Sequence, residues 1–277
     1  MTKVLEGVRV VEVSTMGFVP SAAAVLADWG ANVVKVEHPV HGDVIRGGNT
    51  WGVPADGAQG MSFLWEIFNR GKRSIGVDLN QPAGVEIALR LADSADVFMT
   101  SFLPPARRRI GIDVDDVMAR NPGIVYARGS GRGPEGPLAD AGGFDALCFW
   151  ARSGIASAVT PDDHRDMITM PAPGFGDGLS GMALAGGIAA ALAYRERSGK
   201  GVVVDVSLLS TGMWAMQSSI AATKLTGRDE LKRTARGTPA RPALVDGYRT
   251  KDGRFIALSF DRGDRYWKEF CTAVGRP

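Results

Sequence analysis

The strongest constraint on the fold is an alternation between short β-branched runs and segments with helical spacing. Residues 8–13 form an apolar run rich in valine, and residues 21–29 follow with the pattern of a buried helix. Gly30 is typical of a helix end, and residues 32–37 form a second valine-rich run. A strand, a helix and a strand in this order predict a βαβ unit, in which the two strands are parallel.

The same alternation continues to residue 206. Because βαβ units place helices on the faces of a parallel sheet, it predicts an α/β fold that holds its ligand at the carboxyl ends of the strands. Further strands are predicted at residues 74–78, 96–100, 123–128 and 202–206, and helices at residues 82–92, 114–120, 144–153, 182–194 and 208–226.

The chain is predicted to contain a large α/β domain over residues 1–226 and the beginning of a smaller one. Residues 227–242 are basic and carry two prolines and two glycines, which is typical of a linker. Residues 243–277 predict a hairpin that turns at Asp252 and Gly253, followed by a helix over residues 265–274. One hairpin and one helix bury little surface, so this second α+β domain is expected to be incomplete.

Composition excludes several classes of protein. Apolar residues make up 45% of the 277 residues, enough for a sizeable core, and the formal net charge of +2 does not favour a nucleic-acid partner. Cys148 and Cys271 lie far apart, which is typical of a reducing compartment. With no signal-peptide pattern and no long uninterrupted apolar run, we predict a cytoplasmic protein that does not span a membrane.

Asp177 is the leading candidate for a reacting group. It lies among four glycines in residues 174–181, so its carboxylate could be approached closely and backbone N–H groups could face developing negative charge. The structural alternative is that Asp177 caps the helix predicted to follow it. Its neighbours alone leave both interpretations open.

Other motifs are weaker. No phosphate-loop, dinucleotide or nucleophile-elbow pattern occurs, and His38, His41 and Asp43 lack the further ligands that a metal site needs, so we predict no metal.

Three groups of charged or aromatic residues each have an ordinary structural interpretation. Lys35 and Glu37 are expected to form a water-exposed pair at a strand end. The cations of residues 69–74 could contact phosphate or solvent, and Phe102 and Arg109 could stack on a nucleobase or simply pack.

An ordered set of segments resembles the family III CoA-transferases, the group that contains formyl-CoA and carnitine CoA-transferases and the related 2-methylacyl-CoA racemases. The matching segments are LEGVRVVE at 5–12, LADWGANVVKVE at 26–37, GD at 42–43, Arg46, NRGKRSI at 69–75, ADV at 95–97, NP at 121–122, GPEGP at 133–137, RERSGKG at 195–201 and DVSL at 205–208. The resemblance implies a Rossmann-like large domain, a smaller domain and an interlocked homodimer. Because family members are usually longer, the chain resembles a cut or split form.

The resemblance also implies a chemistry. Asp177 would attack an acyl-CoA thioester, and CoA would pass through an aspartyl-CoA thioester to a free carboxylic acid. CoA and acyl-CoA would be substrates rather than a permanently bound cofactor. The implied CoA-binding residues are Thr15, Met16, Gly17, Phe18, His38, Val77, Ser101, Phe102 and Arg109.

Departures from the family pattern keep the substrate open. Gly17, His38 and Ser101 replace the Gln, Arg and Asn of formyl-CoA-type enzymes, so the acyl group could be aliphatic, aromatic or dicarboxylic. Phe144 stands where racemases carry a histidine before Asp145, which favours transfer over racemisation because racemisation needs that base. A racemase or epimerase, and a non-catalytic CoA-binding subunit or fragment, remain the alternatives.

Overall fold

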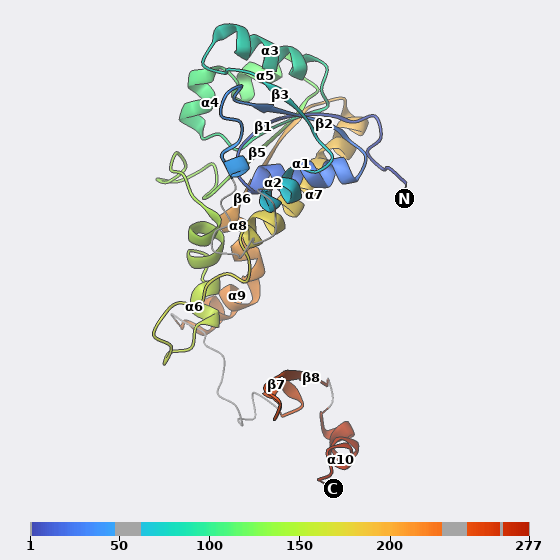
Figure 1. Ribbon diagram of the computed structural model, residues 1–277, viewed down its shortest axis with the longest axis vertical. Coiled ribbons are helices and arrows are strands. Elements are labelled where there is room, and N and C mark those ends of the chain that lie inside the picture. Colours follow the sequence, from blue (N-terminus) through green and yellow to red (C-terminus); the bar gives the residue numbers. More distant parts are fainter. Residues whose placement is uncertain (1, 48–61, 229–242, 261–262, 277) are drawn as a thin grey trace. The chain divides into compact units, whose positions relative to one another are not determined.

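A computed structural model describes residues 2–47, 62–228, 243–260 and 263–276 of the chain (Figure 1). It divides into two compact units, Met1–Ala221 and Ala222–Pro277, which we describe separately. The predicted linker over residues 227–242 stays a prediction, since residues 229–242 lie outside the described ranges.

The larger unit is built on six parallel strands in the order β3-β2-β1-β4-β5-β6. The predicted parallel α/β fold is therefore confirmed. The order reverses at β1, which pairs with β2 on one side and β4 on the other, so the carboxyl ends of β1 and β4 border a crevice. The strands are β1 (Arg9–Val13), β2 (Asn32–Glu37), β3 (Arg73–Gly76), β4 (Val97–Thr100), β5 (Val125–Ser130) and β6 (Val202–Ser207).

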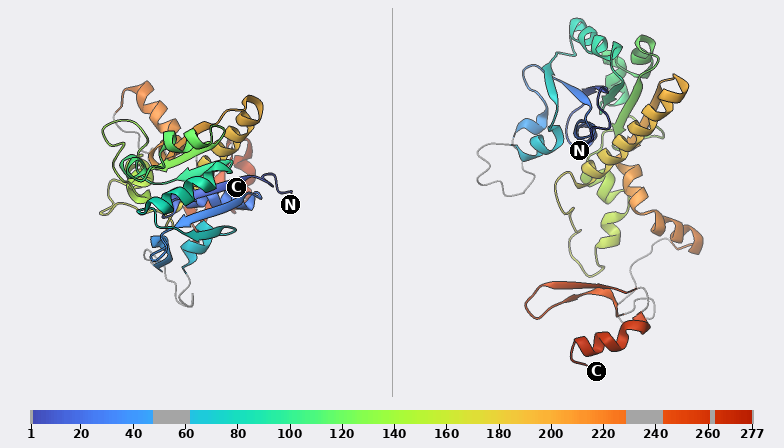
Figure 2. Two further views of the ribbon diagram at one scale, coloured as in Figure 1. Left: turned by 90° about the horizontal axis from the view of Figure 1, so that it is seen from above. Right: turned by 90° about the vertical axis from the view of Figure 1, so that its right-hand side faces the viewer.

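Helices cover both faces of this sheet (Figures 1 and 2). Alternate side chains of β1 supply the two cores: Val10 packs with α1 and α7, whereas Val11 packs on the side of α3 and α5. The helices of this unit are α1 (Phe18–Asp28), η1 (Val44–Gly47), α2 (Phe63–Asn69), α3 (Pro82–Asp93), α4 (Pro104–Ile110), α5 (Val114–Arg120), η2 (Ala146–Ala151), α6 (Ile155–Val159), α7 (Phe175–Ser198), α8 (Leu208–Ala215) and α9 (Gln217–Thr226), which reaches into the second unit.

Helix α7 forms much of the core. It is long and apolar enough by length and composition to cross a membrane, but its packing against α1 and the sheet accounts for that composition. It begins at Phe175 rather than at the predicted residue 182. Sequence analysis also missed α2 and α4, and the helix predicted over 208–226 is divided at Met216.

The smaller unit contains an antiparallel hairpin of β7 (Val245–Arg249) and β8 (Phe255–Ser259), followed by α10 (Gly263–Ala273). Gly253 has a φ of 84° in the turn, a backbone conformation that favours glycine. The predicted hairpin and helix are both present.

Candidate functional site

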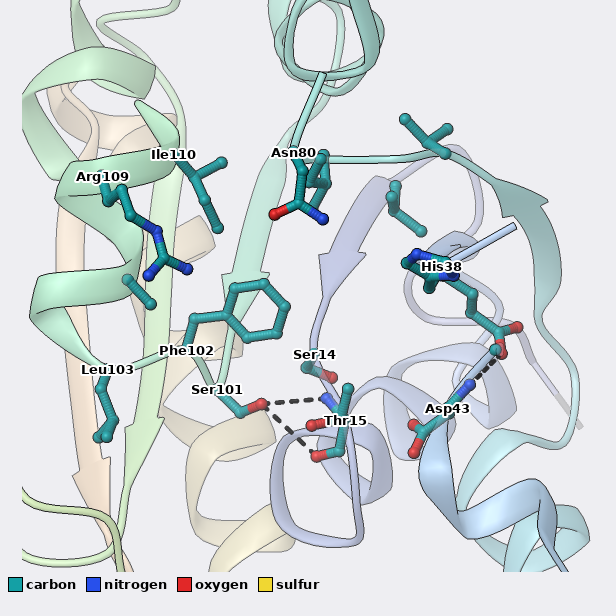
Figure 3. A pocket seen from close by; sticks show the side chains of 16 residues that line it. Ser14, Thr15, His38, Asp43, Asn80, Ser101, Phe102, Leu103, Arg109 and Ile110 are labelled. Atoms are coloured by element: carbon teal, nitrogen blue, oxygen red, sulfur yellow. Dashed lines mark hydrogen bonds between the residues drawn. The ribbon is translucent and has the colours of Figure 1, made fainter. Parts of the chain in front are cut away.

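Two hollows lie on either side of the loop that joins β1 to α1. The first, which we call the strand-end cleft, has a volume of about 480 Å³ and lies at the carboxyl ends of β1 to β4 (Figure 3). The second, which we call the Asp177 cavity, has a volume of about 600 Å³. Ser14 and Thr15 line the cleft, whereas the next two residues, Met16 and Gly17, line the cavity. One loop therefore borders both.

The strand-end cleft gathers six of the nine residues implied to bind CoA. Arg109 on α4 lies on the same side as Phe102, and His38 lies across the cleft from them (Figure 3). Ser101 Oγ accepts a hydrogen bond of 3.0 Å from the Thr15 backbone N–H, which ties the end of β4 to the end of β1. The six residues are Thr15, His38, Val77, Ser101, Phe102 and Arg109.

The other three implied residues lie elsewhere. Met16 and Gly17 line the Asp177 cavity, and Phe18, the first residue of α1, is buried in the core. His38 stacks on His41 with ring centroids 4.7 Å apart. Within the described residues, no group of three His, Cys, Asp or Glu side chains could hold a metal ion.

Asp177 lies in the first turn of α7, two residues inside the helix. The N-cap is Gly174, which has a φ of 72° and no side chain with which to cap the helix. The interpretation of Asp177 as the helix cap is therefore wrong. Its carboxylate instead lies against the backbone of Gly17, where an added Cβ would collide with Oδ2 and lie 2.9 Å from Cγ.

The glycines around Asp177 serve mainly to allow close packing. A Cβ on Gly176 would collide with the Phe149 ring, and one on Gly181 would collide with Ser21 Oγ on α1. By contrast, a Cβ on Gly178 would meet no atom within 4 Å. Glycine thus lets α7 approach α1 and the π-helical turn η2, and this approach places Asp177 beside Gly17.

Two carboxylates share the Asp177 cavity. Burial, and secondarily the charge of Asp145, raise the pKa of Asp177 to about 7. Burial also raises the pKa of Asp145, against the opposing effect of backbone N–H groups of α7. Asp145 Oδ2 accepts a hydrogen bond of 3.0 Å from the Gly176 N–H, so Asp145 supplies an acceptor to the N-terminus of α7.

A buried network of charged side chains supports the loop between β1 and α1. Lys35 Nζ lies 2.8 Å from Glu12 Oε1 and 3.0 Å from Asp43 Oδ2, and Lys72 Nζ lies 2.7 Å from Glu12 Oε2. The side chain of Lys35 is only 1% exposed. The expected water-exposed pair between Lys35 and Glu37 is therefore wrong.

The network holds the loop in an unusual conformation. Asp43 Oδ1 accepts a hydrogen bond of 3.1 Å from the Met16 N–H, and Met16 has a φ of 72°, the single positive value among described residues other than glycine. Such a conformation persists only where its surroundings hold it, and it places Gly17 against Asp177. Sequence analysis missed this role of Asp43.

The cations of residues 69–74 are bound to protein groups. Arg70 pairs with Asp28, Lys72 pairs with Glu12, and Arg73 donates to Asn32 Oδ1 at 2.7 Å. Burial lowers the pKa of Lys72 to about 8, although the Glu12 carboxylate opposes this shift. These contacts favour a structural role over the phosphate contact considered for this segment.

Glu37 makes a separate set of contacts near the cleft. Arg46 binds both carboxylate oxygens at 2.7 and 2.8 Å, and Ser74 Oγ and the Asp43 N–H also donate to it. Burial favours the neutral acid, but these hydrogen bonds lower the pKa of Glu37 to about 2. Glu37 is therefore an ionised structural partner of Arg46.

Comparisons with known proteins agree on one family. Residues 5–277 match CoA-transferase family III. The chain is 36% identical to (R)-2-hydroxy-4-methylpentanoate CoA-transferase of Clostridioides difficile, covering 98% of this chain and 66% of the relative. It is 35% identical to succinyl-CoA:glutarate CoA-transferase of Mus musculus, over 92% of this chain and 56% of the relative. A crystal structure of a CAIB/BAIF family protein from Brucella suis superimposes on this chain with a TM-score of 0.83 at 29% identity. The superposition covers 99% of this chain and 70% of that protein.

Proposed function

The chain belongs to CoA-transferase family III, and from this premise we propose that it moves CoA between an acyl-CoA thioester and a free carboxylic acid through Asp177. The chain spans 66% and 56% of the lengths of the two curated relatives, so the activity of the whole protein is a proposal. The observation that carries the proposal is the position of the Asp177 carboxylate against Gly17, where the strand-end cleft and the Asp177 cavity share one loop.

In this proposal the two hollows divide the substrate between them. The strand-end cleft takes the nucleotide end of CoA, with Arg109 as a phosphate partner and Phe102 as an apolar contact. The Asp177 cavity takes the acyl group, which places the thioester carbonyl beside the loop between β1 and α1. An acyl-CoA that binds across this loop brings its reacting carbon to Asp177.

The reaction is four nucleophilic substitutions with no net proton transfer. The Asp177 carboxylate attacks the thioester carbonyl and expels CoA thiolate, which leaves an acyl-aspartyl anhydride. The thiolate attacks the aspartyl carbonyl and releases the first acid, which leaves an aspartyl-CoA thioester. The acceptor carboxylate attacks that thioester and forms a new anhydride, and the thiolate then attacks the acceptor's acyl carbon and frees Asp177.

The electrostatic surroundings of the Asp177 carboxylate favour these steps. Asp177 lies in the first turn of α7 and against Gly17, the N-cap of α1, which carries no side-chain cap. Helix N-termini favour negative charge, both on the attacking carboxylate and on the oxyanion of each tetrahedral intermediate. The raised pKa of Asp177 makes its ionisation, and hence the rate, depend on pH near 7.

Labelled oxygen tests the proposal directly. When the acceptor acid carries ¹⁸O in its carboxylate, the bridging oxygen of the second anhydride comes from the acceptor and stays on Asp177 when thiolate attacks the acyl carbon. We expect mass spectrometry to find the label in the peptide that contains Asp177 and not in the peptide that contains Asp145. We also expect Asp177→Asn to lose both labelling and exchange. Full exchange in that variant would contradict the proposal.

Racemisation is less favoured by the site. The side chain at position 144 is phenylalanine, and the described lining of the Asp177 cavity contains no histidine. A racemase needs acid–base groups on both sides of the α-carbon. The interlocked homodimer and the cytoplasmic location are further parts of the proposal, and CoA remains a substrate in it.

A further inference from the structure

We propose that the acyl group accepted beside Asp177 comes from an apolar monocarboxylic acid, and that acids with a second carboxylate are rejected. This inference rests on the proposed function, since it names the substrate class of the same site. It is carried by the side chains that line the Asp177 cavity, all of which belong to the larger unit.

The cavity walls are apolar and include several rings. Ile45, Leu64 and Phe68 form a small apolar cluster on one wall, and Phe144 and Trp150 belong to η2 and the residues before it. Phe144 is 67% exposed, so a bound acyl chain would cover apolar surface that otherwise faces water. The volume of about 600 Å³ is within the ~300–1,000 Å³ typical of small-molecule sites.

The charges in the cavity have one sign. Among its described lining residues, the ionisable side chains are the carboxylates of Asp145 and Asp177, with no lysine, arginine or histidine. Residues 48–61, which follow η1 in the chain, also contain no lysine, arginine or histidine in their sequence. That segment therefore cannot supply a positive charge to the cavity.

Arg152 and Arg165, each two residues from a lining residue, are exposed and do not line the cavity. The two cations at the Trp65 ring, next to Leu64, are already paired. Arg46, next to Ile45, binds Glu37 and lies over the Trp65 ring, 3.4 Å from its centroid. Lys35 is buried between Glu12 and Asp43. Neither cation is placed as a partner for a substrate carboxylate in the cavity.

A dicarboxylic acyl group would thus be penalised twice. Its distal carboxylate would leave water for an apolar wall without a cation, and it would share the cavity with two other carboxylates. An apolar chain of the same length meets neither penalty and gains from burial of its carbon atoms. Proteins that accept a second carboxylate commonly hold it with arginine or lysine.

The test compares two thioesters with five acyl carbons, one of which carries a distal carboxylate, with a third that carries an aromatic ring. Binding to Asp177→Asn, which cannot turn substrate over, is measured by calorimetry for pentanoyl-CoA, 3-phenylpropanoyl-CoA and glutaryl-CoA. We expect glutaryl-CoA to bind at least about 10-fold more weakly than the other two, because its distal charge finds no partner. Equal or tighter binding of glutaryl-CoA would overturn the substrate class.

A charge-insertion pair strengthens the test. Met167, an exposed residue of the cavity lining, is replaced in Met167→Arg and in the matched control Met167→Gln, which removes the same apolar side chain without adding charge. We expect Met167→Arg to reduce the discrimination against glutaryl-CoA several-fold and Met167→Gln to keep it. An identical effect of both substitutions would contradict the electrostatic reason for the preference.

The two proposals fail in different ways. If the binding preference is present but the wild-type protein transfers no ¹⁸O to Asp177, the proposed function is wrong and the chemical preference of the cavity stands. If ¹⁸O reaches Asp177 and glutaryl-CoA is the better donor, the transfer reaction stands and the substrate class is wrong.

Discussion

Asp177 is subject to two effects of opposite sign. Burial and the Asp145 carboxylate raise its pKa to about 7, whereas its place in the first turn of α7 and against the start of α1 favours the ionised form. A carboxylate that is partly ionised at neutral pH and not strongly stabilised keeps much of its nucleophilicity. Each effect depends in part on a residue distant from Asp177 in the chain: Asp145 raises the pKa, and Gly17 brings the start of α1 to the carboxylate.

This balance predicts how Asp177→Asn changes stability with pH. The folded pKa of about 7 lies above the usual unfolded value of about 3.9, so between these values the folded state binds a proton that the unfolded state lacks. The contribution of Asp177 to the free energy of unfolding is therefore complete below about pH 4 and is lost as pH rises through 7. We compare the free energies of unfolding of Asp177→Asn and wild type. After discounting for the partial exposure of Asp177, we expect the difference to shift by about 1–2 kcal/mol in favour of the variant between pH 5 and pH 8.

Urea titrations of both proteins at the two pH values measure this gain. Asp163→Asn, which changes an exposed loop carboxylate, serves as the control and should follow the wild-type curve. Parallel stability curves for Asp177→Asn and wild type would show that Asp177 is not destabilised by its surroundings.

At the scale of elements, the contact between α1 and α7 decides where Asp177 lies. The Ser21 hydroxyl on α1 is within hydrogen-bonding distance of the Asp177 carbonyl, at 3.0 Å, and Gly181 allows the two helices to approach. A Cβ at Gly181 would also lie 2.9 Å from the Ala22 backbone nitrogen. The helix pair is therefore part of the support of the site.

Two glycine substitutions on α7 should have opposite effects on stability. Gly181→Ala forces a Cβ into Ser21 and the backbone of α1, and we expect it to lower the free energy of unfolding by about 1–3 kcal/mol or more. In Gly178→Ala the added Cβ meets open space, and alanine replaces a poor helix former. We therefore expect the free energy of unfolding to rise by up to about 1 kcal/mol. Chemical denaturation of both variants measures the difference, and an equal loss in both would contradict the packing argument.

At the scale of the whole molecule, the parallel sheet gathers the ends of β1 to β4 along one edge. This arrangement brings Thr15, His38, Val77 and Ser101 together from four separate connections. The buried network of Glu12, Lys35, Asp43 and Lys72 links the same edge to the loop beside Asp177. The cleft and the loop between β1 and α1 are therefore supported by one set of contacts.

If CoA occupies the strand-end cleft, it should stabilise the protein by mass action. At 100 times its dissociation constant, a ligand that binds only the folded state adds about 2.7 kcal/mol to the free energy of unfolding. We expect Arg109→Ala to weaken CoA binding about 10-fold or more by removing a charge-assisted phosphate contact. Its neighbour Arg108 does not line the cleft and provides the control Arg108→Ala. The Arg108 side chain is 58% exposed, and its Nη2 lies 3.9 Å from Asp140 Oδ2.

Calorimetry and CoA-dependent thermal shifts measure both arginine variants. Equal losses in the two would point to a general effect of positive charge rather than a contact in the cleft. Added salt should weaken the Arg109 contribution, because part of it is electrostatic.

Local patterns predicted the elements whose cause is local. The boundaries of α5 and β2 agree with those expected from apolar spacing, and the hairpin turn at Asp252 and Gly253 was recognised from its turn residues. The start of α7 was missed because glycines read as loop, whereas here they are required by close contacts with other elements. Lys35 was read as exposed because its partners Glu12 and Asp43 lie in other parts of the chain.

The sequence by itself determined the parallel α/β fold, the family and Asp177 as the candidate nucleophile, because alternating apolar runs and ordered motifs are properties of the chain as written. The tertiary structure alone decided that Asp177 is not a cap, that it lies against Gly17 and shares its cavity with Asp145, and that the walls there are apolar without a described cation. Burial, pKa and the lining of a cavity depend on which distant residues meet, and only the folded chain brings them together.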